Sequence, residues 1–320
     1  KLAKMVNSTL LGSDQSGKYF KLTADIDLSA HRWIPIGYGD ANSTPFSGFF
    51  DGSGKTITGM VVDETANKKF AGLFGVIGVR TTDDAAVKNL TIENASVTVD
   101  VYDASLYYGA GILAGNVTLI GGSGADFVPI TNCHVSGSVT GGMRAGGFVG
   151  AAAYARISDS SAEVTIKGYD AAGGFVGTDW CGSYENCEAF GTVESSGWST
   201  GGFVGYIGGD TDNPANIKKC FTNVDVSAAD WNLGGFAGYV AANTEISNSV
   251  AYGDVTSNVT DWCPKAGGFT GTNMGRVSLS HALGTVTENT SGYDAGGFVG
   301  SDVGGITSGC SFSNEKNPGS

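Results

Sequence analysis

Small or apolar residues alternate with polar residues in short segments along most of this chain. Three of these segments are ITNCHVSGSV (130–139), ISNSVAYGDV (246–255) and VSLSHALGTV (277–286). An alternation with a period of two residues, without any period near 3.6, is typical of β-strands. No segment between them has the pattern of a crossover helix, which argues against a fold of alternating strands and helices. The pattern predicts an all-β protein.

A glycine-rich hexapeptide, AGGFVG in its commonest form, stands before these segments and divides the chain into repeats. The apolar residue at its centre recurs at intervals of 27 to 39 residues, at Leu73, Ile112, Phe148, Phe175, Phe203, Phe236, Phe269 and Phe298. A short constant motif with a spacer of variable length is typical of a solenoid whose insertions lie in loops. We therefore expect a right-handed parallel β-helix of about eight coils. The phenylalanines should stack inside it, and the glycines should make a corner at positive φ.

The N-terminal region departs from the repeat. LAKMVNSTLLG has a short helical pattern, whereas YFKLTADIDLS and FDGSGKTITGMVV alternate as strands. The end of a solenoid exposes unpaired backbone, so a terminal cap is expected there. We assign residues 1–60 to this cap and the first coil, 61–312 to the repeat β-helix, and 313–320 to a linker within a larger multidomain chain.

The run GKYFKLTADIDLSAHRWIPIG, followed by PFSGFFDGSGKTITGM and the AGGFVG copies, resembles the GLUG-repeat β-helix domains of bacterial cell-surface adhesins. Domains of this kind also occur beside immunoglobulin A-specific metallopeptidases. The resemblance covers nearly the whole chain, as far as Cys310. It implies a secreted or cell-surface location and an adhesive role. The family has no agreed catalytic motif, so the resemblance transfers no catalytic residue.

Composition and charge narrow the choice of partner. The chain has 52 glycines, 6 prolines and only 15% charged residues, which is typical of a folded, turn-rich protein. Its net charge of −13 argues against nucleic acid and against anionic membrane surfaces. No run of about 20 apolar residues could cross a bilayer. A cell-surface glycan or a protein is the expected partner.

Residues for catalysis or metal binding are sparse. His134 and His281 occupy the same repeat position five coils apart, so they cannot share a metal ion or a proton. Metallopeptidase, nucleophile-elbow and phosphate-loop motifs are absent. We predict no cofactor, although the many acidic residues leave Ca²⁺ open. Carboxylates from neighbouring coils could form an acid–base pair, or they could simply form a solvated acidic face; the candidates are Asp170, Asp179, Asp230, Asp261 and Asp294.

Most of the cysteines share one position in the repeat with serine. Cys133, Cys187, Cys220 and Cys310 align with Ser160, Ser249 and Ser280, so this slot should face inward and hold free thiols. Cys181 and Cys263 follow tryptophans in loops. A disulfide between Cys181 and Cys187 is conceivable.

An aromatic residue precedes most copies of the hexapeptide, often with an aspartate beside it. These rings either fold over the corner and cover apolar residues, or form an exposed stripe that suits a glycan or a protein partner. The candidate ligand-binding residues are Tyr108, Tyr169, Trp198, Trp231, Trp262 and Tyr293, with Asp170, Asp230, Asp261 and Asp294.

These observations together favour a non-catalytic surface adhesin domain that binds a host or cell-surface ligand through the aromatic stripe. A polysaccharide lyase or glycoside hydrolase on the same scaffold is the enzymatic alternative. A structural spacer that holds another domain away from the cell is the third.

Overall fold

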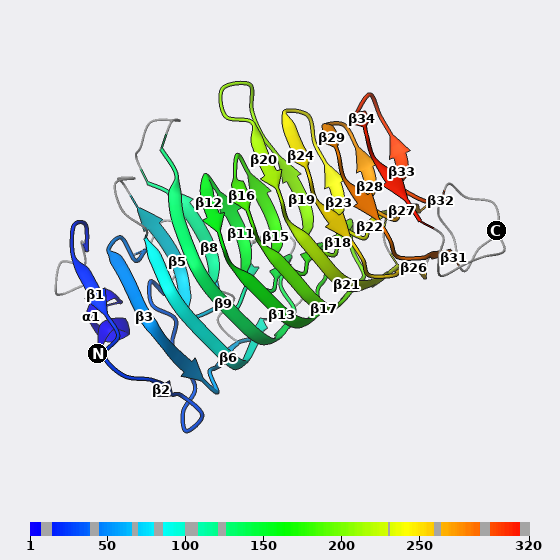
Figure 1. Cartoon of the computed structure of the whole chain (residues 1–320). Helices are drawn as coiled ribbons and strands as arrows, with labels where there is room; N and C mark the ends of the chain where they lie inside the picture. Colours follow the sequence, from blue (N-terminus) through cyan, green and yellow to red (C-terminus); the bar gives the residue numbers. More distant parts are fainter. Residues whose placement is uncertain are drawn as a thin grey trace.

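Parallel pairing joins each coil of the chain to the next in the computed structural model (Figure 1). The structure describes residues 1–7, 15–38, 45–65, 70–79, 86–99, 108–120, 126–229, 231–258, 264–288 and 295–313. Every strand pairing within this described part is parallel, with shifts of register within the β3–β6 and β6–β9 pairs, and the strands form three sheets that run the length of the solenoid. The prediction of a parallel β-solenoid of about eight coils is confirmed.

Sheet 1 covers the long side of each coil and contains 20 described strands. They are β1 (Tyr19–Lys21), β2 (Ile26–Asp27), β3 (Phe49–Thr58), β4 (Val61–Glu64), β6 (Val87–Val99), β9 (Val128–Thr140), β12 (Ala155–Ser158), β13 (Ser161–Lys167), β16 (Ser183–Glu185), β17 (Glu188–Ser195), β20 (Ala215–Lys218), β21 (Phe221–Ala228), β24 (Thr244–Ser247), β25 (Val250–Ala251), β26 (Val255–Ser257), β29 (Arg276–Ser278), β30 (His281–Ala282), β31 (Val286–Glu288), β34 (Ile306–Ser308) and β35 (Ser311–Phe312).

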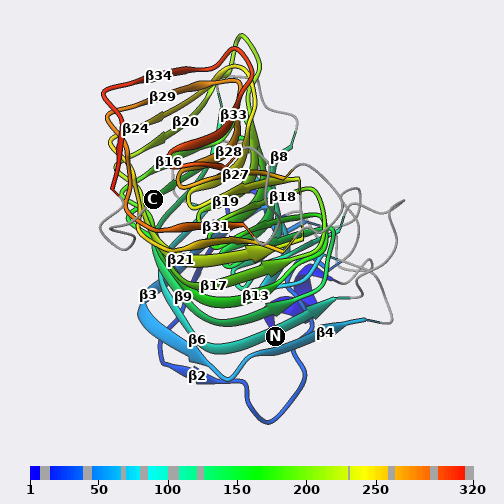
Figure 2. The same ribbon diagram turned by 90° about the vertical axis from the view of Figure 1, so that its right-hand side faces the viewer.

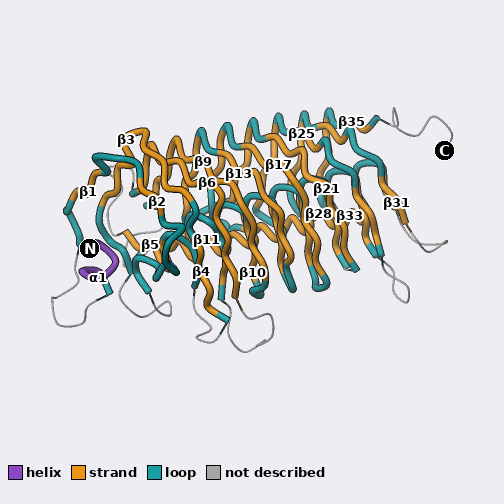
Figure 3. Tube along the Cα trace, turned by 90° about the horizontal axis from the view of Figure 1, so that it is seen from below, coloured by secondary structure: helices purple, strands orange, loops and turns teal. Residues whose placement is uncertain are grey.

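Sheets 2 and 3 meet within the hexapeptide, because in most coils the strand of sheet 3 ends at its first glycine and the strand of sheet 2 begins directly after its phenylalanine. Sheet 2 consists of β5 (Phe74–Val79), β8 (Ala114–Leu119), β11 (Val149–Ala153), β15 (Val176–Trp180), β19 (Val204–Gly208), β23 (Ala237–Val240), β28 (Thr270–Asn273) and β33 (Val299–Asp302). Sheet 3 consists of β7 (Gly109–Ala110), β10 (Arg144–Gly146), β14 (Ala171–Gly173), β18 (Ser199–Gly201), β22 (Asn232–Gly234), β27 (Lys265–Gly267) and β32 (Ala295–Gly296). Figures 2 and 3 show the stacked coils from two further sides.

A short helix, α1 (Leu2–Val6), lies at the N-terminal end of the solenoid, where the sequence predicted helical character (Figure 1). Val6 is fully buried against the core. The Asn7 side chain donates to the Pro35 carbonyl and accepts from the backbone N–H groups of Gly37 and Tyr38. These bonds attach the helix to the chain that follows β2.

The phenylalanines of the hexapeptide stack in the interior of the solenoid, as predicted. Their ring centroids lie 4.6 to 5.0 Å apart, and neighbouring planes differ by 6° to 11°, along the ladder Phe148, Phe175, Phe203, Phe236, Phe269 and Phe298. The spacing follows the separation of paired strands, about 4.8 Å, because each ring occupies the same position in its coil. Offset parallel rings at this distance attract one another beyond the apolar area that they bury.

The prediction that the hexapeptide glycines turn at positive φ is wrong, because none of them has a positive φ. A Cβ on the first glycine of the pair, such as Gly201, would lie 2.2 Å from the carbonyl oxygen of Val204. On the second, Gly202, it would lie 2.1 Å from the carbonyl oxygen of Gly235 in the next coil. Glycine is required here because backbone meets backbone.

A recurring set of non-glycine residues turns at positive φ at the bend of sheet 1 in successive coils. They include Asn132, Asp159, Asn186 and Asn248, with φ between 51° and 54°. Asparagine and aspartate adopt this left-handed conformation more readily than most residues. Their side chains also bond between coils, since Asn186 donates to Asp159 at 3.1 Å.

The cysteine–serine slot faces inward, as predicted. Cys133, Cys187 and Cys220 are buried, and Cys310 is partly buried at the last described coil. The serines in the slot extend a hydrogen-bonded row, because the Ser249 hydroxyl accepts from the N–H of Cys220. Cys181 and Cys187 are both free thiols, so the disulfide that the sequence left open between them is not formed.

Candidate functional site

The solvent-facing sides of sheets 2 and 3 meet at the hexapeptide and form a groove there. A Cβ on Gly177, in β15 of sheet 2, would lie 2.9 Å from the backbone N of Ala145, in β10 of sheet 3. Further along, the Thr272 hydroxyl of β28 donates to the side-chain amide oxygen, Oδ1, of Asn232 in β22 at 2.6 Å. The two sheets therefore fold toward each other on the outside of the solenoid.

Two columns of side chains line this groove, one from each sheet. Strand register places Asn116, Ala151, Thr178, Tyr206 and Tyr239 in one column of sheet 2. It places Arg144, Ala171, Ser199 and Asn232 in one column of sheet 3.

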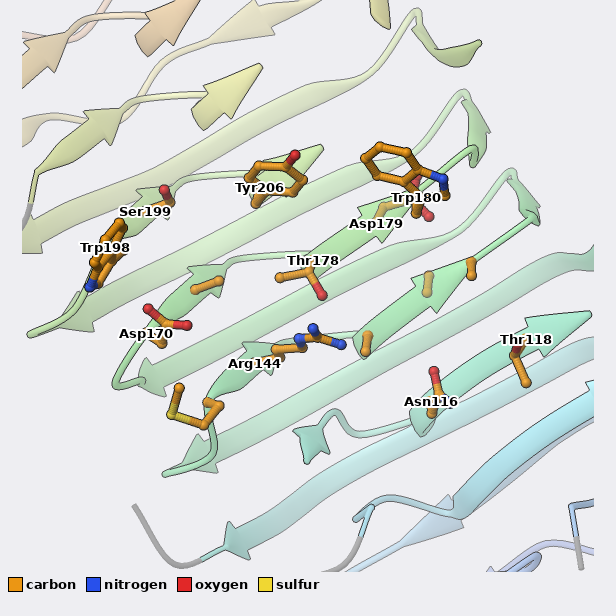
Figure 4. Close-up of a pocket in the computed structure, with 15 residues that line it drawn as sticks. Asn116, Thr118, Arg144, Asp170, Thr178, Asp179, Trp180, Trp198, Ser199 and Tyr206 are labelled. Atoms are coloured by element: carbon orange, nitrogen blue, oxygen red, sulfur yellow. The ribbon is translucent and has the colours of Figure 1, made fainter. Parts of the chain in front are cut away.

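The groove opens into a hollow of about 730 Å³ in the middle of the solenoid (Figure 4). The hollow lies where both columns carry alanine, at Ala151 and Ala171. Near the C-terminal end, Thr272 and Asn232 occupy the same columns and bond across the groove. The width of the groove is thus set by which side chains each coil contributes.

Aromatic rings form the C-terminal side of the hollow. Figure 4 shows Trp198, Tyr206 and Trp180 on this side and Asn116 and Thr118 on the opposite side. Arg144 and Thr178 lie between the two sides. Trp198 is 66% exposed and Trp180 is 42% exposed. A Cβ on Gly208 would approach the Trp180 ring to 2.8 Å, so this ring lies over the backbone of the following coil.

Two of these rings are backed by a second ring from the following coil. Trp198 stacks on Trp231 with centroids 5.8 Å apart and planes 8° apart. Tyr206 stacks on Tyr239 at 5.3 Å and 11°. The stacking occupies the C-terminal side of Trp198 and Tyr206 and leaves their other side toward the hollow.

Polar groups lie beside the rings. The backbone carbonyl of Asp170 accepts from the N–H of Trp198, which places the Asp170 side chain directly before this ring in the same column. Burial raises the pKa of Asp170, and the charge of the nearby Arg144 guanidinium offsets part of that rise. The hollow therefore combines apolar ring surface with the carboxyl of Asp170, the guanidinium of Arg144 and the hydroxyls of Thr178 and Ser199.

Asp179 borders the hollow through its strand, but its carboxyl is buried inside the solenoid. Oδ2 accepts from the N–H of Gly182 at 2.7 Å. Burial raises the pKa of Asp179 to about 7, although the nearby Tyr184 hydroxyl and the Gly182 N–H both favour the charged form. Neither Oδ1 nor the Tyr184 hydroxyl has a partner with full hydrogen-bond geometry among the described residues. Asp170 and Asp179 thus do not form an exposed carboxylate pair.

The structure brings only part of the predicted stripe together. Trp198 and Trp231 are stacked and exposed, and the preceding coils carry Asp170, Met143 and Tyr108 in the same column. Tyr108 instead packs edge-on against Phe70. Tyr169 is half-buried and lies one residue before this column. Trp262, Tyr293, Asp230, Asp261 and Asp294 lie outside the described residues.

Trp180, Tyr206 and Arg144 were not predicted as site residues. Trp180 and Tyr206 follow the hexapeptide rather than preceding it, and Arg144 is a lone cation in GGMR. The sequence did contain one signal, the run of three alanines at 151–153 in a position where other repeats carry larger residues.

The histidines stay far from this groove. Strand register puts His134 and His281 in one column of sheet 1, five coils apart, as predicted. Each ring bonds to the serine of the next coil, Ser161 or Ser311. Within the described part of the chain, no group of three or more His, Cys, Asp or Glu residues is arranged to hold a metal ion.

The fold and groove define a β-solenoid with a lateral cavity, and comparison with known proteins agrees with the resemblance seen in the sequence. The GLUG motif family matches residues 141–167, which contain β10, β11, β12 and β13. The chain carries a GLUG motif at the coil that forms the floor of the hollow.

Two curated proteins share part of the sequence. A "Putative Gly-rich membrane protein" of Evansella cellulosilytica is 36% identical over 106 residues, which are 31% of this chain and 11% of that protein. "Halomucin" of Haloquadratum walsbyi is 32% identical over 160 residues, 46% of this chain and 2% of that protein. The chain thus spans a small part of these relatives.

One solved structure has the same fold over most of the chain. It is the crystal structure of a "putative immunoglobulin A1 protease" from Bacteroides ovatus, with a TM-score of 0.62 and 21% identity. The match covers 93% of this chain and 78% of that one. At this identity the likeness establishes the fold alone. Among the described residues of our chain, no helix has the length and apolar character needed to cross a membrane.

Proposed function

We propose that this chain is a non-catalytic binding domain of a surface-associated protein, an adhesin-type module that attaches to a glycan or protein on a cell. The observation that carries this proposal is the open hollow walled by Trp180, Trp198 and Tyr206. Aromatic rings that are both exposed and rigidly packed are typical anchors of binding sites.

The names of the relatives support a surface location. One is called a membrane protein and the other a halomucin, and both are far longer than this chain. A solenoid is well suited to such proteins because it extends a surface along one axis while each coil contacts only its neighbours.

The enzymatic alternative has less support. A glycosidase needs two carboxyl groups about 5–10 Å apart on the substrate side of the protein. Among the described residues, two acids border the hollow: Asp170 is half-buried, and Asp179 is buried within the solenoid. Asp179 would have to leave the interior to act on a substrate.

Two assays on the purified chain test the proposal. Fluorescently labelled chain should bind intact cells in a saturable way, and an excess of unlabelled chain should displace it. Incubation with a panel of polysaccharides should produce no new reducing or unsaturated ends. Saturable binding separates an adhesin from a spacer, and new chain ends would replace the binding proposal with an enzymatic one.

A further inference from the structure

The shape of the hollow depends on a change of side chain within single columns. In sheet 2, Ala151 and Thr178 are followed by Tyr206 and Tyr239. At the position directly before each strand of sheet 3, Asp170 is followed in the next coils by Trp198 and Trp231. In each column a short polar residue, Thr178 or Asp170, directly precedes the stacked aromatic rings, so each stack ends with one ring face at the edge of the hollow.

The end of each stack combines an apolar face with adjacent polar groups. Asp170 comes directly before Trp198, and Thr178 comes directly before Tyr206. A pyranose ring has the complementary chemistry, because its C–H face can stack on an aromatic ring while the hydroxyls at its rim bond to neighbouring polar groups. Each stack end therefore offers a position for one sugar ring.

The strands that form the groove do not offer an edge to an extended peptide. β11 is paired on both sides with β8 and β15, and β14 is paired on both sides with β10 and β18. A peptide that adds to a sheet needs an unpaired strand edge. The groove can therefore recognise a ligand only through side chains, which favours a saccharide over an extended peptide.

Charge favours a neutral saccharide over an acidic one. The chain has a net charge of −13, so a polyanion would be repelled from most of its surface. Within the hollow, Arg144 is accompanied by Asp170, whose carboxyl feels the guanidinium charge. The cation is thus already close to an internal counter-charge, while the carboxylate remains suited to accept hydrogen bonds from hydroxyls.

We propose that the hollow binds a short segment of a neutral glycan, with sugar rings against Trp198 and Tyr206 and with Asp170 and Arg144 bonded to hydroxyls. This inference rests on the proposed function and specifies its ligand. The hollow extends over the coils from Asn116 to Tyr206, three strand spacings or about 14 Å. Its volume of about 730 Å³ lies within the usual range for small-ligand sites, about 300–1,000 Å³.

The first experiment identifies the class of ligand. The whole chain is applied to an array of neutral linear hexose oligomers of increasing length, the corresponding uronic acid oligomers, and immobilised cell-surface proteins. We expect retention on neutral oligomers, with affinity that stops rising once the oligomer exceeds the length of the hollow. Preference for uronic acid oligomers, or binding to proteins alone, would overturn the inference.

The second experiment locates the site by filling the hollow. Ala151→Tyr introduces the side chain that the same column carries at Tyr206, so the scaffold accommodates it at that position. Titration calorimetry with the best neutral oligomer should show at least tenfold weaker binding. The matched control is Ser301→Tyr, at the same column position in the last described coil and outside the hollow. It should leave the affinity unchanged.

Two more variants test the roles of individual groups. Trp198→Ala should weaken binding about fivefold to tenfold through loss of ring stacking, and Asp170→Asn about tenfold through loss of a charged acceptor. Glu163→Gln, on exposed sheet 1, is the control for the carboxylate. All variants should keep the wild-type circular dichroism spectrum and a melting temperature within a few degrees.

The outcomes separate this inference from the proposed function. Binding to cells without binding to any neutral oligomer, or oligomer binding that Ala151→Tyr leaves intact, would refute the glycan site while leaving the adhesin proposal in place. A chain that binds neither cells nor any component of the array would refute both.

Discussion

Replacing Asp179 by asparagine should stabilise the solenoid at neutral pH and change its stability little in acid. The carboxyl is buried, and burial raises its pKa from 3.8 to about 7. A raised pKa means that the folded state holds its proton more tightly than the unfolded state does. The stabilising contribution is therefore complete below about pH 4 and is lost as the pH rises through 7.

The size of the effect follows from the pKa difference. A shift of about 3 pKa units corresponds to about 4 kcal/mol, at about 1.4 kcal/mol for each unit. Asparagine has nearly the same shape and carries no charge, so its Oδ1 can still accept from the N–H of Gly182. The difference in unfolding free energy between variant and wild type should rise by up to about 4 kcal/mol between pH 4 and pH 8.

Guanidinium denaturation of both proteins, followed by circular dichroism at several pH values, measures this difference. Asp302→Asn is a closely matched control, because Asp302 occupies the same column of sheet 2 and accepts from the N–H of Gly305, but is exposed. Its curve should stay parallel to that of the wild type. If Asp179→Asn were equally destabilising at every pH, the carboxylate would be a required partner in the core and our reasoning would fail.

Two further predictions concern the core and the hexapeptide. Phe203→Ala should lower the unfolding free energy by about 3–5 kcal/mol, because the ring is buried and stacked on both sides. Phe190→Ala, on the outer side of sheet 1, should lower it clearly less in the same denaturation assay. Equal losses for the two variants would contradict a stabilising role of the phenylalanine ladder. Gly201→Ala should lower the unfolding free energy several times more than Gly54→Ala. A Cβ at Gly201 would meet a carbonyl oxygen at 2.2 Å, whereas a Cβ at Gly54 would enter open space and would be disfavoured only by the positive φ of that residue. A smaller loss of melting temperature for Gly201→Ala than for Gly54→Ala would show that backbone approach does not explain the motif.

The sequence could predict the solenoid because its periodicities are local and repeated. The alternation in blocks such as ISNSVAYGDV (246–255) specifies strands, and the constant hexapeptide specifies the corner. Residues at one repeat position then share one environment, which is why Phe203 and its equivalents stack and why Cys220 shares an inward slot with Ser249. Predictions of this kind need only the register between coils.

The reason for each glycine was harder to predict from the sequence. Positive φ and close backbone approach both require glycine, and the residue type does not distinguish them. Gly201 is needed because its coil folds sharply back on itself, a contact that depends on three-dimensional structure. The residues with left-handed backbone could have been predicted, since asparagine recurs at one position of the repeat, at Asn132, Asn186 and Asn248.

The groove could not be predicted because it depends on differences between coils rather than on what they share. The stripe hypothesis looked for one aromatic residue in most coils, Tyr169 among them, and the structure stacks Trp198 on Trp231 but places Asp170 in their column in the preceding coil. A continuous stack covers ring faces with other rings and leaves mainly edges for a ligand. A ring face becomes available where a stack ends, and two stacks end beside the same hollow because Ala151 and Ala171 leave space there. In a solenoid of this kind, the coil at which an exposed column changes from small to aromatic residues is therefore where a binding site should be sought.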